Sequence, residues 1–228
     1  ITALSWLNSN EYKHSNGSLA VGKAYAHDIP YYFIGATVIL DYFEIYPAGS
    51  AINYVEEDAC PIPGEVAAIR RLISEIDNVH LRRFISTALS LPLAFSRFWN
   101  SPVSCAVYIE KGTLAVNSRQ AAELAARAMA DQPAWMAFAA TYGLLHGYGK
   151  IWCHEEDEFC ELPKHLLAEE VRYEMLLPAL AELKQASPEA GKVMESLISG
   201  SWQIDDLEIS RCIGRTVQTI IEKQTKAY

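Results

Sequence analysis

The sequence predicts a mainly α-helical domain that follows a small N-terminal β-hairpin or sheet. From Glu65 onward, apolar residues recur every three or four positions, which is the period of an amphipathic helix. The first 60 residues are instead rich in tyrosine, glycine and β-branched residues, a composition typical of strands and turns. With 228 residues, of which 50% are hydrophobic, the chain can bury one sizeable core. We therefore expect a β-rich appendage over 1–62, packed on the core of a helical domain over 63–228.

Turn-forming residues divide the two parts into elements. Strands are expected over 18–26 and 31–46, because the His-Asp-Ile-Pro segment between them is typical of a turn. A short strand is expected over 105–109, and the segment 134–146 should be the most buried helix because it has little room for a polar face. The helix that starts at 79 is expected to run to Phe98. The expected helices begin at Glu65, Val79, Asn117 or Ser118, Ala134, Pro163, Pro188 and Ile204.

The charge balance bears on possible partners. The 19 basic and 28 acidic side chains give a net charge of -9, which opposes direct binding to nucleic acid because that affinity comes from Lys and Arg displacing counterions. An acidic surface is instead compatible with a basic protein partner, including the cationic groove of a nucleic-acid-binding complex. No segment approaches the roughly 20 apolar residues of a membrane span, so no membrane association is expected.

The cysteines and the first residues favour a cytoplasmic protein. The five cysteines are odd in number and lack the CxxC spacing of a structural zinc site, so scattered structural thiols are the simplest interpretation. Cys153 and Cys160, with His154 between them, form a wider pair that is an alternative metal site. The first ten residues have no basic segment followed by a long apolar run, and therefore no signal peptide is predicted.

Several short motifs between Arg83 and Leu183 fall in a characteristic order. They are the helix ending in Arg97 and Phe98, the Leu-Ala-Val-Asn-Ser turn at 114–118, the Leu-Leu-His-Gly helix end at 144–147, the Glu-Leu-Pro-Lys-His segment at 161–165, and a helix with Glu169, Glu170 and Glu174. This order resembles the HD-domain nucleotide phosphohydrolases, in particular the short bacteriophage members and the bacterial 5'-deoxynucleotidases. The resemblance covers a little under half of the chain. It implies an HD-domain-like helical bundle of phage or mobile-element origin, located in the host cytoplasm, and a homodimer as the default assembly.

The resemblance also implies a divalent metal, held by two histidines and two aspartates from separate helices, that activates a water. His146 corresponds to the second histidine, but Gly147 stands where its paired aspartate is expected. The turn at 117–120, where the first histidine is expected, contains Arg119 and no imidazole. Lys150 replaces the acidic residue that often follows the pair.

Asp205 and Asp206 are the candidates for the last aspartate. Acidic residues at a helix N-terminus are equally well explained by the helix dipole. At most two of the four implied ligands therefore remain, which is too few to hold a catalytic metal in the ordinary way.

Each candidate residue also has a plainer interpretation. His146, at the end of an apolar helix, is more often a capping or core residue than a ligand. The acidic cluster Glu155, Glu156, Asp157 and Glu158 lacks the spacing of a calcium loop, so it is a solvated loop or a recognition feature for a partner. A metal site rebuilt from new residues is a further alternative. Its ligands would be His154, Asp157, Glu161 and His165.

Three functional hypotheses follow. The first is a catalytically degenerate HD-like protein without a cofactor that binds a protein partner, for which an inhibited nucleic-acid-binding host defence complex is a candidate. The alternative is a nucleotide phosphohydrolase with a rearranged site for manganese, cobalt or magnesium, using His146, His154 and Asp205 or Asp206. In the third hypothesis, Arg119 and Lys150 bind the phosphates of a nucleotide that is not cleaved.

Overall fold

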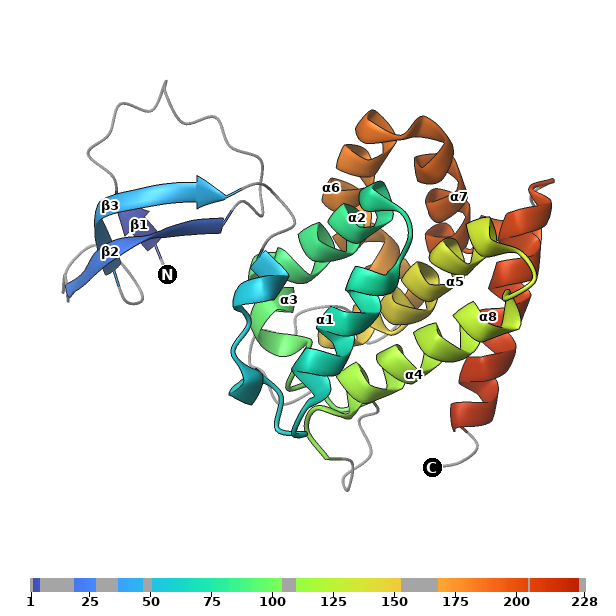
Figure 1. Cartoon of the computed structure of the whole chain (residues 1–228), viewed down its shortest axis with the longest axis horizontal. Helices are drawn as coiled ribbons and strands as arrows, with labels where there is room; N and C mark the ends of the chain where they lie inside the picture. Colours follow the sequence, from blue (N-terminus) through green and yellow to red (C-terminus); the bar gives the residue numbers. More distant parts are fainter. Residues whose placement is uncertain are drawn as a thin grey trace.

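The computed structural model describes residues 2–4, 19–27, 37–46, 51–103, 110–152, 168–204 and 206–225. The expected strand over 105–109 and the start of the helix expected from Pro163 lie outside these residues. The described strands are β1 (Thr2–Leu4), β2 (Leu19–His27) and β3 (Thr37–Tyr46), in the order β1-β3-β2 (Figure 1). β1 is parallel to β3, whereas β2 is antiparallel to it. That this sheet packs on the helical core stays a prediction.

The described part of the chain is mainly helical, as the sequence predicted (Figure 1). α4 packs along α5, α6 packs along α7, and α8 lies against α4. No helix among the described residues is long and apolar enough to cross a membrane. The α-helices are α1 (Glu65–Glu75), α2 (Val79–Ser90), α3 (Pro92–Arg97), α4 (Thr113–Ala128), α5 (Pro133–Leu145), α6 (Ala168–Ala186), α7 (Pro188–Ser199) and α8 (Glu208–Thr225). The 3-10 helices are η1 (Ala51–Tyr54), η2 (Glu57–Ala59), η3 (Tyr148–Trp152) and η4 (Ser201–Gln203).

Three helix boundaries differ by more than one residue from those predicted. The helix expected from Val79 to Phe98 is broken at Leu91, which is extended because the following Pro92 disfavours a helical conformation in the preceding residue. α4 begins at Thr113, where Gly112 adopts the left-handed conformation at the N-cap, so Asn117 and Ser118 are buried inside the helix and do not cap it. The last helix begins at Glu208, four residues after the predicted Ile204.

The hydrophobic core includes residues that precede the first long helix. Ile52, Val55 and Cys60 are all buried against the helical core. Arg70 on α1 holds this segment in place, because its guanidinium donates to the carbonyls of Ile52 and Val55 and also pairs with Glu57 at 2.8 Å. The helical unit therefore includes the segment from Ile52 to Cys60, which lies within the range predicted for the appendage.

Candidate functional site

A buried arginine lies where α6 meets the C-terminal ends of α5 and α7. Arg172 is 2% exposed, and its Nη1 donates to the carbonyl of His146 at 2.9 Å while its Nη2 donates to that of Ile198 at 3.0 Å. Its Cζ also lies 5.6 Å from the centre of the Tyr142 ring. The last carbonyls of a helix lack partners within the helix and carry partial negative charge. One guanidinium therefore caps two helices and is stabilised by both dipoles.

His146 is the C-cap residue of α5 and is half-buried. Its ring meets Tyr142 edge-on, with 5.7 Å between the ring centres. Burial, together with the positive charges of Arg172 and Lys150, lowers the pKa of His146 to about 3. The imidazole is therefore neutral near pH 7, but the two cations beside it disfavour a divalent metal ion.

The glycine after His146 lies against α4. A Cβ atom at Gly147 would approach Cδ1 of Leu114 to 2.8 Å and Oγ of Ser118 to 3.7 Å. Ser118 belongs to the turn where the resemblance puts the first histidine, so the structure brings together two positions that would carry metal ligands. Neither position carries one, and an aspartate side chain at 147 would require Leu114 to move. Ser118 Oγ is buried, with no hydrogen-bond partner among the described residues.

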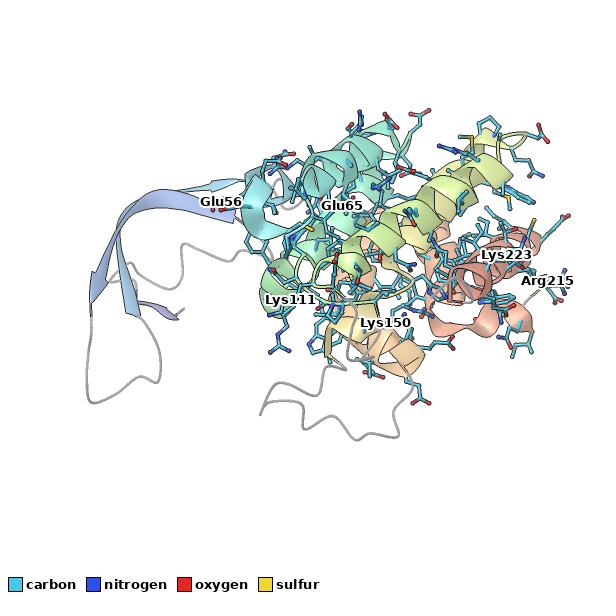
Figure 2. All side chains as sticks on the ribbon, turned by 90° about the horizontal axis from the view of Figure 1, so that it is seen from below. Glu56, Glu65, Lys111, Lys150, Arg215 and Lys223 are labelled. Atoms are coloured by element: carbon cyan, nitrogen blue, oxygen red, sulfur yellow. The ribbon has the colours of Figure 1, made fainter. Side chains whose placement is uncertain are left out.

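Both candidate anion-binding cations make contacts within the protein. Arg119 donates from Nε to Glu65 at 2.7 Å and from Nη1 to Glu123 at 2.8 Å, and the bond to Glu65 raises the pKa of the guanidinium. Glu65 is itself buried, so the pair is shielded from solvent. The Nζ atom of Lys150 donates to the carbonyl of Val103 at 2.9 Å. Figure 2 labels both Glu65 and Lys150. One guanidinium faces two carboxylates, which leaves no net positive charge for a phosphate around Arg119.

Of the other predicted site residues, the structure describes Asp206 alone. Asp206 is exposed just before α8. Within the described ranges, no three histidine, cysteine, aspartate or glutamate side chains are grouped to hold a metal ion. The described residues around His146 therefore do not fit the divalent metal that the resemblance implies. The predicted residues outside the described part of the chain are Cys153, His154, Glu155, Glu156, Asp157, Glu158, Cys160, Glu161, His165 and Asp205.

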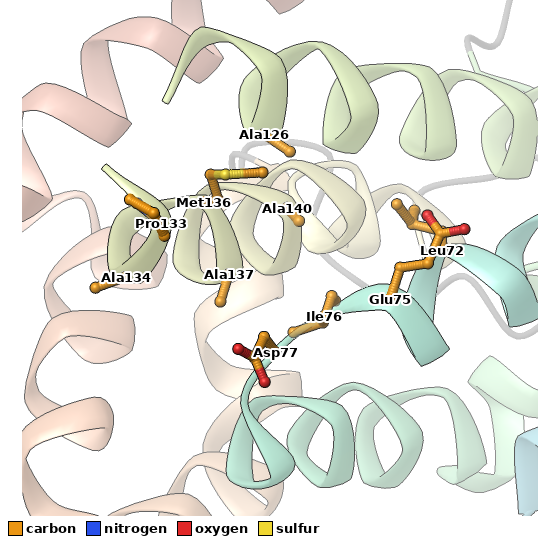
Figure 3. A pocket seen from close by; sticks show the side chains of 10 residues that line it. All are labelled: Leu72, Glu75, Ile76, Asp77, Ala126, Pro133, Ala134, Met136, Ala137 and Ala140. Carbon is orange, nitrogen blue, oxygen red and sulfur yellow. The ribbon is translucent and has the colours of Figure 1, made fainter. Parts of the chain in front are cut away.

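A separate groove of about 570 Å³ lies between the end of α1, the end of α4 and the start of α5 (Figure 3). Two exposed carboxylates, Glu75 and Asp77, stand at the α1 side. This groove was not predictable from the sequence, because apolar periodicity does not reveal which apolar residues stay uncovered. Its other lining residues are apolar and are Leu72, Ile76, Ala126, Pro133, Ala134, Met136, Ala137 and Ala140.

No family model, curated protein or solved structure matches this chain.

The low pKa of His146 makes stability depend on pH. The unfolded chain binds a proton at this position below a pH of about 6.5, whereas the folded chain does so only near pH 3. This group therefore leaves the free energy of unfolding independent of pH above about pH 6.5 and lowers it as the pH falls from 6.5 toward 3. Between pH 7 and pH 5, the free energy of unfolding should therefore fall by about 1–2 kcal/mol less in His146→Gln than in the wild type. Urea unfolding of both proteins at the two pH values measures this, and an unchanged pH dependence would contradict the assignment.

Proposed function

We propose that this chain is a catalytically degenerate HD-like protein, of phage or mobile-element origin, that acts by binding a basic protein partner. The observation that carries the proposal is the environment of His146, the one implied histidine that remains. Arg172 and Lys150 place positive charge beside its ring, and the paired aspartate at position 147 is replaced by a glycine whose added Cβ atom would require Leu114 to move. A site with this charge repels the cation that phosphoester hydrolysis in the resembling family requires.

The charge of the whole chain supports the choice of partner. A net charge of -9 favours encounter with a cationic surface and opposes contact with nucleic acid itself. The cationic groove of a nucleic-acid-binding host defence complex has this chemistry, and an acidic protein bound there competes with the nucleic acid. The acidic cluster at 155–158 remains the predicted recognition feature for such a groove.

Metal content and phosphate release test the loss of catalysis. After incubation with manganese, cobalt or magnesium, we expect far less than one metal ion per chain and no phosphate release from nucleoside mono- or triphosphates. Mass spectrometry of the dialysed protein measures the first quantity, and a malachite green assay measures the second.

Two variants make the test sharper. Gly147→Asp, which recreates the pair implied by the resemblance, should gain neither metal nor activity because the cations beside His146 remain. Stoichiometric metal and phosphate release in the wild type, both lost in His146→Ala, would establish the phosphohydrolase instead.

A further inference from the structure

The groove between α1 and α5 exposes part of the apolar surface of α5. The 13 residues of α5 include no charged side chain, and a helix that is apolar on all sides is usually covered on all sides. Its second half is buried in the core, but Pro133 and Ala134 are exposed and Trp135 and Met136 are only half-buried. The described part of the chain therefore leaves the first turn of α5 uncovered.

The lining of the groove suits a partner with large side chains. Small side chains form much of the surface, since Ala126, Ala134, Ala137 and Ala140 all line it (Figure 3). Alanine side chains are short and leave space above the groove. Large side chains of a partner can fill this space.

The polar residues at the groove are acidic. Its polar lining residues are Glu75 and Asp77, which are exposed at its α1 side. No basic residue is among the described lining residues; Arg71 and Arg127 only adjoin lining residues along the chain. Carboxylates beside an apolar groove are complementary to a partner with apolar anchors and flanking Lys or Arg.

We infer that this groove is the docking site for a basic amphipathic helix of a protein partner. Helix-in-groove recognition places apolar anchors at positions i, i+3 or i+4 and i+7 of the bound helix. The anchors pack on the alanines and Met136, and the flanking cations meet Glu75 and Asp77. The inference rests on the proposed function, because it names the surface and the chemistry by which the partner is held.

Fluorescence anisotropy with three labelled peptides of about 16 residues tests this docking site. The first has leucines at the anchor positions and flanking lysines, the second replaces the lysines with glutamates, and the third scrambles the first. We expect only the first to bind measurably, with an affinity at least about tenfold above those of the other two.

Matched protein variants locate the binding. Glu75→Gln combined with Asp77→Asn should weaken binding of the lysine peptide about fivefold to tenfold and reduce its salt dependence. Ala134→Trp, at an exposed position, should block the groove and abolish binding. Glu56→Gln combined with Glu110→Gln removes two exposed carboxylates that do not line the groove, and it should leave the affinity unchanged.

Several outcomes would overturn the inference. Among them are equal binding of the scrambled peptide and equal weakening by the control pair, because either indicates nonspecific attraction to an acidic surface. Light scattering that shows a dimer, converted to monomer by Ala134→Trp, would make a second copy the occupant. If the protein has neither metal nor activity and does not bind the lysine peptide, only the docking site is refuted. If the protein holds a metal and is active, the proposed function is refuted.

Discussion

Arg172→Ala is expected to lower the free energy of unfolding by about 3–5 kcal/mol. The substitution removes the donors to the carbonyls of His146 and Ile198 and leaves both acceptors without those partners around a side chain that is 2% exposed. It also removes the cation above the Tyr142 ring and opens a cavity at the end of α5. Urea unfolding followed by circular dichroism at pH 7 measures the loss.

Two further substitutions separate the hydrogen bonds of Arg172 from its charge and volume. Arg172→Met restores much of the volume but donates no hydrogen bond, so it should remain at least about 2 kcal/mol less stable than the wild type. Arg211→Ala removes an exposed arginine of α8 and should change stability by less than about 0.5 kcal/mol. If Arg172→Ala stays within about 1 kcal/mol of the wild type, the two carbonyls have found other donors and the capping role is wrong.

Gly143→Val is expected to destabilise the protein by about 3 kcal/mol. A Cβ atom at Gly143 would lie 2.8 Å from Cα and 2.9 Å from the backbone nitrogen of Ala122, so α4 and α5 touch through their backbones here. The added side chain can be accommodated only if the two helices move apart. The packing between α4 and α5 would then be lost. Thermal unfolding followed by circular dichroism measures the effect.

The control for this substitution lies on the exposed face of α4. Ala128→Val introduces the same β-branched side chain at an exposed helical position and should cost no more than about 0.7 kcal/mol, the difference in helix propensity. Gly143→Ala should fall between the two, because its gain in helix propensity offsets part of the steric clash. Equal effects of the two valine substitutions would show that α4 and α5 do not approach so closely.

The helical class was predictable because it depends on local periodicity, which each segment carries by itself. The predicted helix boundaries were wrong where one local signal competes with another. At the start of α4, the left-handed Gly112 provides the N-cap conformation without a side-chain hydrogen bond, and this overrides the capping preference of Asn117 and Ser118. At Leu91, the proline effect overrides an apolar pattern that continues from α2 into α3.

The candidate site was predictable only in part, because its decisive features are three-dimensional. His146 and the missing aspartate were predictable, since both depend on residue identity alone. Arg172 was not, because it lies close to Glu169, Glu170 and Glu174 and looks like a solvated residue of a charged helix in the sequence. The groove was missed for a related reason: the composition of α5 predicts burial, but only the packing of its neighbours shows that Ala134 remains exposed.

The guanidinium shared by two helix ends also bears on how the domain opens. Fraying normally begins at the last turn of a helix, where carbonyls are exposed to water. The last turns of α5 and α7 are instead joined through Arg172. If one of these turns unfolds, the buried guanidinium loses one of its two acceptors, and the other helix alone cannot compensate its charge. The three helices should therefore behave as one cooperative unit toward local opening, and amide exchange at these ends should require the unit to open as a whole.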